Sequence, residues 1–161
     1  MRKSLTDIWL TETHLACMIA EAKQFAPKET GGVFMGYRAR DSIVITNVIG
    51  SGPNAVHQSV FYRPDLQYEE TQIAKAYAES KRMHTYLGDW HTHPSGILRL
   101  SRKDKIALAT IAKSKEARIE RPIMAILAGE NDDWRCHVWE YISRLISLMG
   151  PTMRSMRLKM Y

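Results

Sequence analysis

Residues 86–104 constrain the fold of this chain more than any other stretch of its sequence. Residues 86–91 are rich in apolar and aromatic side chains, which predicts a buried β-strand. Side chains two apart on a strand share one face, so His91 and His93 should point the same way. The Pro-Ser-Gly sequence that follows at 94–96 has the composition of a turn and should end the strand.

A helix is predicted soon after this turn. Ser101 is suited to be its N-cap, and Asp104 three residues later completes the pattern of a capping box. The side chain of Asp104 should lean back toward the helix N-terminus. A capping pair or a His-x-His sequence alone is common, but their combination is more specific. Two neutral imidazoles and one carboxylate are a usual ligand set for catalytic zinc, whose fourth position is left to water. The stretch therefore predicts a zinc site at His91, His93 and Asp104.

In order and spacing, these residues resemble the active-site motif of the JAMM/MPN (JAB-domain) zinc metallopeptidases. Glu29 lies upstream, just before a glycine-rich segment. The sequence His-Thr-His-Pro follows, with seven residues between His93 and Ser101 and two between Ser101 and Asp104. The resemblance implies that His91, His93 and Asp104 bind Zn²⁺. It also implies that Glu29 is the general base and that Ser101 hydrogen-bonds the oxyanion.

The periodicity of apolar residues predicts a mixed α/β protein. Helices are expected at 11–25, 65–83 and 101–117, and strands at 32–38, 43–49, 59–62, 86–91, 122–128 and 134–141. The second helix should bury a face with Leu66, Ile73 and Tyr77 and leave Glu69 in solvent. This order indicates a curved mixed β-sheet flanked by helices, which agrees with the JAMM/MPN (cytidine-deaminase-like) fold that the resemblance implies.

The chain is expected to form one domain over residues 1–161. Its basic, Met-rich end at 144–161 is open to three interpretations: a final helix, a partner-binding segment or a frayed tail.

Composition excludes several classes of protein. The chain is 45% hydrophobic and 25% charged, as in globular domains. No apolar run approaches the ~20 residues of a membrane helix, and acidic residues interrupt any leader-like stretch near the N-terminus. Cys17 and Cys136 are far apart and form no disulfide framework. We therefore expect a cytoplasmic protein, without membrane partners, whose two thiols are buried and inert.

The resemblance implies a peptidase or isopeptidase that cuts after the C-terminus of a ubiquitin-like or conjugated protein. The short chain is most similar to the small bacterial deconjugating peptidases of CBASS antiphage operons, which release a nucleotidyltransferase (CD-NTase) from its target. The C-terminal tail of the modifier would be the partner, bound by strand addition. Leu100 stands where many such sequences have proline, and it is available to line the substrate groove.

Two other functions remain open from sequence. The first is a catalytically silent MPN scaffold, although such members usually lose one of the five positions kept here. The second is a RadC-like JAB protein linked to DNA, which the net charge of +6 favours. No DNA-binding module is recognisable beside the motif, so nucleic acid is not the expected partner.

Overall fold

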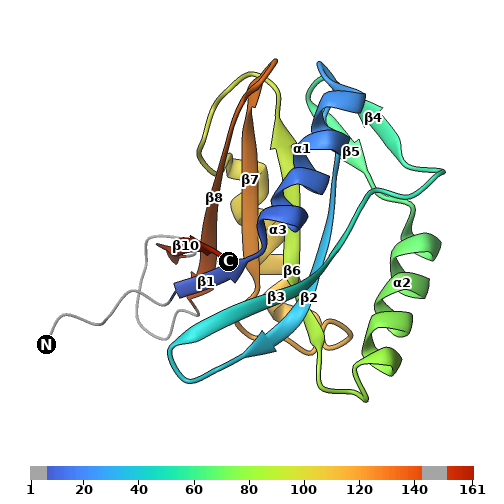
Figure 1. Cartoon of the computed structure of the whole chain (residues 1–161), viewed down its shortest axis with the longest axis vertical. Coiled ribbons are helices and arrows are strands. Elements are labelled where there is room, and N and C mark those ends of the chain that lie inside the picture. Colours follow the sequence, from blue (N-terminus) through green and yellow to red (C-terminus); the bar gives the residue numbers. More distant parts are fainter. Residues whose placement is uncertain (1–6, 143–151) are drawn as a thin grey trace, which may run out of the picture.

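The computed structural model describes residues 7–142 and 152–161. Its main feature is an eight-stranded mixed sheet with the order β10-β1-β3-β2-β6-β7-β8-β9 (Figure 1). Strand β1 is parallel to β3 and β10, and β6 is parallel to β7, whereas the other neighbours are antiparallel. The bounds are β1 Asp7–Leu10, β2 Gly31–Arg38, β3 Ser42–Ile49, β6 Thr85–His93, β7 Ile123–Glu130, β8 Asp133–Ile142, β9 Thr152–Ser155 and β10 Arg157–Met160. The expected mixed α/β sheet is confirmed.

Helices cover both faces of this sheet (Figure 1). Successive residues of β7 point to opposite faces, and both sets are buried. Ile123, Ala125 and Leu127 pack in one core cluster with Met18 and Ala22 of α1 (Glu12–Phe25). The alternate β7 residues pack in a second cluster with α3 (Arg102–Lys113). Helix α2 (Leu66–Glu79) covers β2 on the same face of the sheet as α3.

An irregularity in β6 sets the direction of the histidines. Gly88 has a positive φ of 144°, and a Cβ placed there would lie 1.9 Å from the Ile123 carbonyl oxygen, so the position requires glycine. Leu87 and Trp90 consequently share the α1 face although they are three residues apart. The side chains of the odd-numbered residues Asp89, His91 and His93 therefore point to the opposite face of the sheet, toward α3.

The chain ends in strands, so the interpretation of 144–161 as a helix or a frayed tail is wrong for its described part, residues 152–161. Strand β9 pairs with β8, and β10 pairs with β1 at the other end of the strand order. Met156, between them, is buried and donates its N–H to Val138 at 2.9 Å. The sheet must therefore be strongly curved. Residues 144–151 lie outside the described part.

Two predicted helices end earlier than expected, and one predicted strand is half of a hairpin. Helix α2 stops at Glu79 because Lys81 and Arg82 adopt left-handed conformations. Helix α3 stops at Lys113, where Ser114 turns to extended backbone. The strand expected at 59–62 is instead β5 (Phe61–Arg63), paired with β4 (Val56–Gln58) across a turn at residues 59 and 60.

Helix α2 also packs through a different face from the one predicted. Leu66 and Tyr77 are 64% and 41% exposed, whereas Glu69, expected in solvent, is only 8% exposed. Of the three predicted residues, Ile73 does pack against β2, and Ala76 packs beside it. Three positions, 69, 73 and 76, form the covered stripe, because residues three and four apart lie on one side of a helix.

A buried carboxylate joins strands at the end of the sheet opposite the two histidines. Glu140 of β8 is fully buried and accepts hydrogen bonds from Arg38 at 2.9 Å, from Arg121 at 2.7 Å and from Arg154. This cluster fastens β2, β8 and β9 to one another. Among the described helices, none is both long and apolar enough to cross a membrane.

Candidate metal centre and active site

The three predicted metal ligands lie together. His91 Nε2 is 3.1 Å from His93 Nε2, and the Asp104 carboxylate is 3.0 Å from His91 Nε2 and 3.5 Å from His93 Nε2. Each side chain is only 11–14% exposed. Within residues 7–142 and 152–161, this is the one cluster of His, Cys, Asp and Glu that has metal-binding spacing.

These separations fit a tetrahedral metal ion. Four ligands with bonds of about 2.1 Å lie roughly 3.4 Å from one another around zinc. The observed distances of 3.0, 3.1 and 3.5 Å are close to that value. The site therefore has the ligand types and the spacing for a divalent metal ion, and three protein ligands leave one tetrahedral position for water.

The orientation of His93 is fixed by the loop after β6. Its Nδ1 lies 2.8 Å from the carbonyl oxygen of Ile97 and must donate to it. The neutral ring then carries its lone pair on Nε2, the atom that faces His91 and Asp104. This loop contact thus selects the tautomer that binds a metal.

Asp104 is held by the capping box that the sequence predicted. Its carboxylate accepts from Ser101 N at 2.6 Å, and the Ser101 hydroxyl accepts from Asp104 N at 3.2 Å. Burial works to raise the pKa of Asp104, but the neighbouring imidazoles of His91 and His93 outweigh it and hold that pKa well below its usual range. Asp104 is therefore ionised at neutral pH, as a metal ligand must be.

Glu29 precedes β2, and its backbone is bonded on both sides. Its N–H donates to Gln58 of β4 at 2.8 Å, and its carbonyl accepts from His57 Nδ1 at 3.0 Å. The next residue, Thr30, is fully buried and donates its N–H to the hydroxyl of Thr92 at 2.9 Å. Since Thr92 lies between the two metal-site histidines, Glu29 is tied directly to the strand that carries them.

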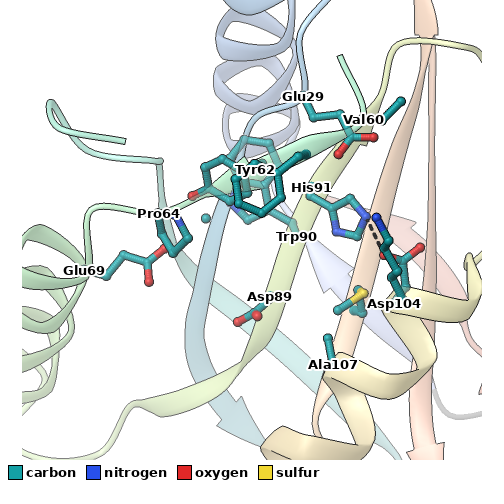
Figure 2. Close-up of a pocket in the computed structure, with 14 residues that line it drawn as sticks. Glu29, Val60, Tyr62, Pro64, Glu69, Asp89, Trp90, His91, Asp104 and Ala107 are labelled. Atoms are coloured by element: carbon teal, nitrogen blue, oxygen red, sulfur yellow. Dashed lines mark ion pairs between the residues drawn. The ribbon is translucent and has the colours of Figure 1, made fainter. Parts of the chain in front are cut away.

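Glu29 faces the same pocket as His91 and Asp104 (Figure 2). The pocket has a volume of about 320 Å³. Burial raises the pKa of Glu29, and the nearby imidazoles oppose the change. A carboxyl group with a raised pKa beside a metal site is suited to accept and return a proton.

Ser101 and Leu100 lie at the start of α3. Ser101 is exposed next to Asp104, outside the set of described residues that line the pocket. Leu100 is 8% exposed and packs with Leu108 and Ile126. The expectation that Leu100 is available to line the substrate groove is therefore wrong, because the side chain belongs to the core under α3.

Sequence reasoning missed several residues of this region. His57 holds the Glu29 backbone through a hydrogen bond, and no sequence signal links residues 28 apart. Glu69 and Asp89 line the pocket although neither was assigned to the site. Cys17 is exposed, contrary to expectation, whereas burial raises the pKa of Cys136 to about 12 and leaves it unreactive.

Comparison with known proteins agrees with this geometry. Residues 11–141 match the family model for prokaryotic homologs of the JAB domain. A probable metalloprotease, y4qB of Sinorhizobium fredii, is 39% identical over 134 residues, which cover 82% of each chain. A CD-NTase/cGAS isopeptidase of Enterobacter hormaechei is 27% identical over 128 residues, covering 79% of this chain and 70% of that protein. A similarly named protein of Vibrio cholerae is 24% identical over 106 residues, or 66% of this chain and 65% of that one.

The fold is also found in a solved structure. The solution structure of protein DSY2949 from Desulfitobacterium hafniense superposes with a TM-score of 0.68 at 20% identity, covering 96% of this chain and 92% of that one. The chain belongs to the family of prokaryotic homologs of the JAB domain. Its relatives are named as a metalloprotease and as isopeptidases, and it is accordingly a hydrolase of the metallopeptidase class.

Proposed function

We propose that the protein is a zinc-dependent peptidase or isopeptidase that releases a ubiquitin-like or conjugated protein from its target. The observation that carries this proposal is the ligand cluster of His91, His93 and Asp104, of which His91 and Asp104 line a pocket together with Glu29. His93 and Asp104 are pre-oriented by Ile97 and Ser101, so little rearrangement is needed to bind the ion. Zinc held there would lower the pKa of a bound water to about 7 and polarise a carbonyl group.

Glu29 is the general base and then the general acid. Its carboxylate accepts a proton from the attacking water and later gives it to the departing amine, which balances the hydrolysis of one amide bond. The raised pKa favours this exchange, because a group whose pKa lies nearer neutrality both takes up and releases a proton readily. The hydrogen bonds that the Glu29 backbone donates to Gln58 and accepts from His57 keep the side chain beside the metal site.

Ser101 stabilises the tetrahedral oxyanion. Its oxygen already accepts from Asp104 N, but a hydroxyl group also has one hydrogen to donate. That hydrogen is available to an oxyanion near Asp104, at the exposed start of α3. A preorganised donor of this kind is worth about 10²–10³-fold in kcat.

The β4–β5 hairpin is the proposed platform for the substrate tail. It forms a sheet of only two strands, and its turn residue Val60 and neighbour Phe61 are 76% and 45% exposed. Both line the pocket. An extended tail can add to the hairpin as a strand and lay its C-terminus beside Glu29.

The relatives narrow the candidate substrates. Proteins named CD-NTase/cGAS isopeptidase match this chain at 24–27% identity in three bacteria. We infer that a conjugated CD-NTase is the first substrate to test and that the enzyme acts in antiviral defence of the CBASS type.

The test is cleavage of a fusion between the C-terminal segment of a CD-NTase and a reporter. Cleavage at the junction should require zinc and should stop on addition of a chelator. The Glu29→Gln variant should retain zinc and cleave at least 10³-fold more slowly. A protein that binds zinc but cleaves neither this fusion nor other tail fusions would contradict the proposal and favour a scaffold.

A further inference from the structure

The pocket extends beyond the metal ligands to two more carboxyl groups. Glu69 of α2 and Asp89 of β6 line it together with His91 and Asp104. Figure 2 shows Glu69 and Asp89 on one side of the pocket and the metal-site residues on the other. We call the part lined by Glu69 and Asp89 the acidic end.

Glu69 is buried but unpaired. Its residue is 8% exposed, and across the described ranges its side chain has no hydrogen bond or ion pair. The hydroxyl of Tyr62, which lines the same pocket, is also buried without a partner. Buried polar groups normally have partners, since leaving them unpaired is costly. Among the described residues, the Tyr62 hydroxyl is thus a buried group without a partner, and the Glu69 carboxylate beside it has only the open pocket, so the two together point to a ligand.

The surroundings define the chemistry of that ligand. One oxygen of Asp89 accepts from the Tyr86 hydroxyl at 2.6 Å. Burial, together with the nearby Asp89 carboxylate, raises the pKa of Glu69 to about 8, and a cation would relieve both effects. The ring of Tyr62, which is partly exposed, also lines the pocket and can contact a cation and its aliphatic stem.

Two alternatives fit less well. A hard metal ion requires six or more oxygen ligands, or several retained waters, rather than two carboxylates among aromatic walls. Moreover, Glu69 and Asp89 form no group with metal-binding spacing among the described residues. The one lysine of the pocket lining, Lys103, is exposed and acts electrostatically on Glu29, so it does not neutralise the acidic end.

We propose that the acidic end binds the ammonium or guanidinium group of a basic side chain in the polypeptide substrate, close to the bond that is cut. The inference rests on the proposed function, because it assumes that a polypeptide lies across the metal site. Glu69 and Asp89 would then determine specificity, since a substrate with a neutral or acidic residue at that position offers no cation to the two carboxyl groups.

Binding of small probes tests this inference without requiring hydrolysis. The zinc-loaded full chain is titrated with acetyl-arginine amide and with the neutral acetyl-norleucine amide, and NMR shifts of the Trp90 indole are followed. Arginine amide should bind at least tenfold more tightly. Glu69→Gln and Asp89→Asn should each remove that preference, whereas Glu70→Gln, which alters the exposed neighbouring carboxylate, should keep it. Thermal melts show that each variant is folded.

Equal binding of the two probes, or a preference that survives in both Glu69→Gln and Asp89→Asn, would overturn the inference. Hydrolysis is measured separately on tail fusions with and without a basic residue near the junction. A wild-type protein that shows no probe preference but hydrolyses the fusions refutes the acidic end alone. An intact probe preference with no hydrolysis of any fusion refutes the proposed function alone.

Discussion

Replacing Ser101 by glycine should separate two roles of its hydroxyl group, capping α3 and donating to the oxyanion. The oxygen accepts one capping bond, from Asp104 N at 3.2 Å, while the reciprocal bond from Ser101 N to Asp104 is a backbone donation that alanine, glycine and threonine all retain. Loss of an N-cap costs about 0.5–2 kcal/mol for alanine but only a few tenths for glycine. Loss of an oxyanion donor costs about 2.7–4 kcal/mol in the transition state, or 10²–10³-fold in kcat.

The assay pairs urea unfolding with kcat/KM on one substrate at one pH. Ser101→Ala should lose about 1 kcal/mol of stability and about 10²-fold or more in activity. Ser101→Gly should lose as much activity with almost no loss of stability, and Ser101→Thr, which keeps a hydroxyl, should stay close to wild type. Domains with 5–15 kcal/mol of stability remain folded after such changes, so unfolding cannot explain the kinetic loss. Wild-type kcat/KM in Ser101→Gly would refute the oxyanion role.

Three further perturbations follow from the packing. Glu140→Gln leaves three arginine side chains around a neutral group, which should lower the free energy of unfolding in urea by about 3 kcal/mol. A change within about 0.5 kcal/mol would show that the cluster does not stabilise the protein. Folding disfavours the ionised form of Glu69, so the free energy of unfolding of wild type should fall relative to that of Glu69→Gln as pH rises from 4.5 to 8, by at most about 5 kcal/mol. A variant whose stability relative to wild type decreases over that range would contradict this. In Gly31→Ala, the new Cβ would lie 2.3 Å from the Trp90 carbonyl oxygen and 2.8 Å from His91 Cβ. The resulting shift of β6 should weaken zinc binding about tenfold or more, as measured by isothermal titration calorimetry. An unchanged affinity for zinc would refute the need for close contact between the two strands.

The metal cluster could be predicted from sequence because its determinants are local. A strand, a turn and a capped helix lie within residues 85–113, and the rules for alternation and capping place His91, His93 and Asp104 without knowledge of the rest of the fold. Figure 1 shows β6 near the middle of the sheet with α3 beside it, as those rules require.

The errors concern contacts between distant segments. Strands β9 and β10 are four residues each, too short to be recognised by pattern, and they are stabilised by pairing with β8 and β1. Glu69 carries a charge, so periodicity placed it in solvent, but α2 turns that side toward a pocket that the sequence does not define. His57 reaches Glu29 only through the β4–β5 hairpin, whose position depends on the whole domain.

Zinc content and hydrolytic activity, measured in matched wild-type and Glu29→Gln proteins with His91→Ala as the metal-free control, decide whether this site is that of a metallopeptidase. We expect one zinc ion per chain in wild type and Glu29→Gln, none in His91→Ala, and cleavage of a tail fusion by wild type alone. Full cleavage by Glu29→Gln, or a wild-type protein that binds no zinc, would contradict the assignment of His91, His93 and Asp104 as ligands and Glu29 as the base.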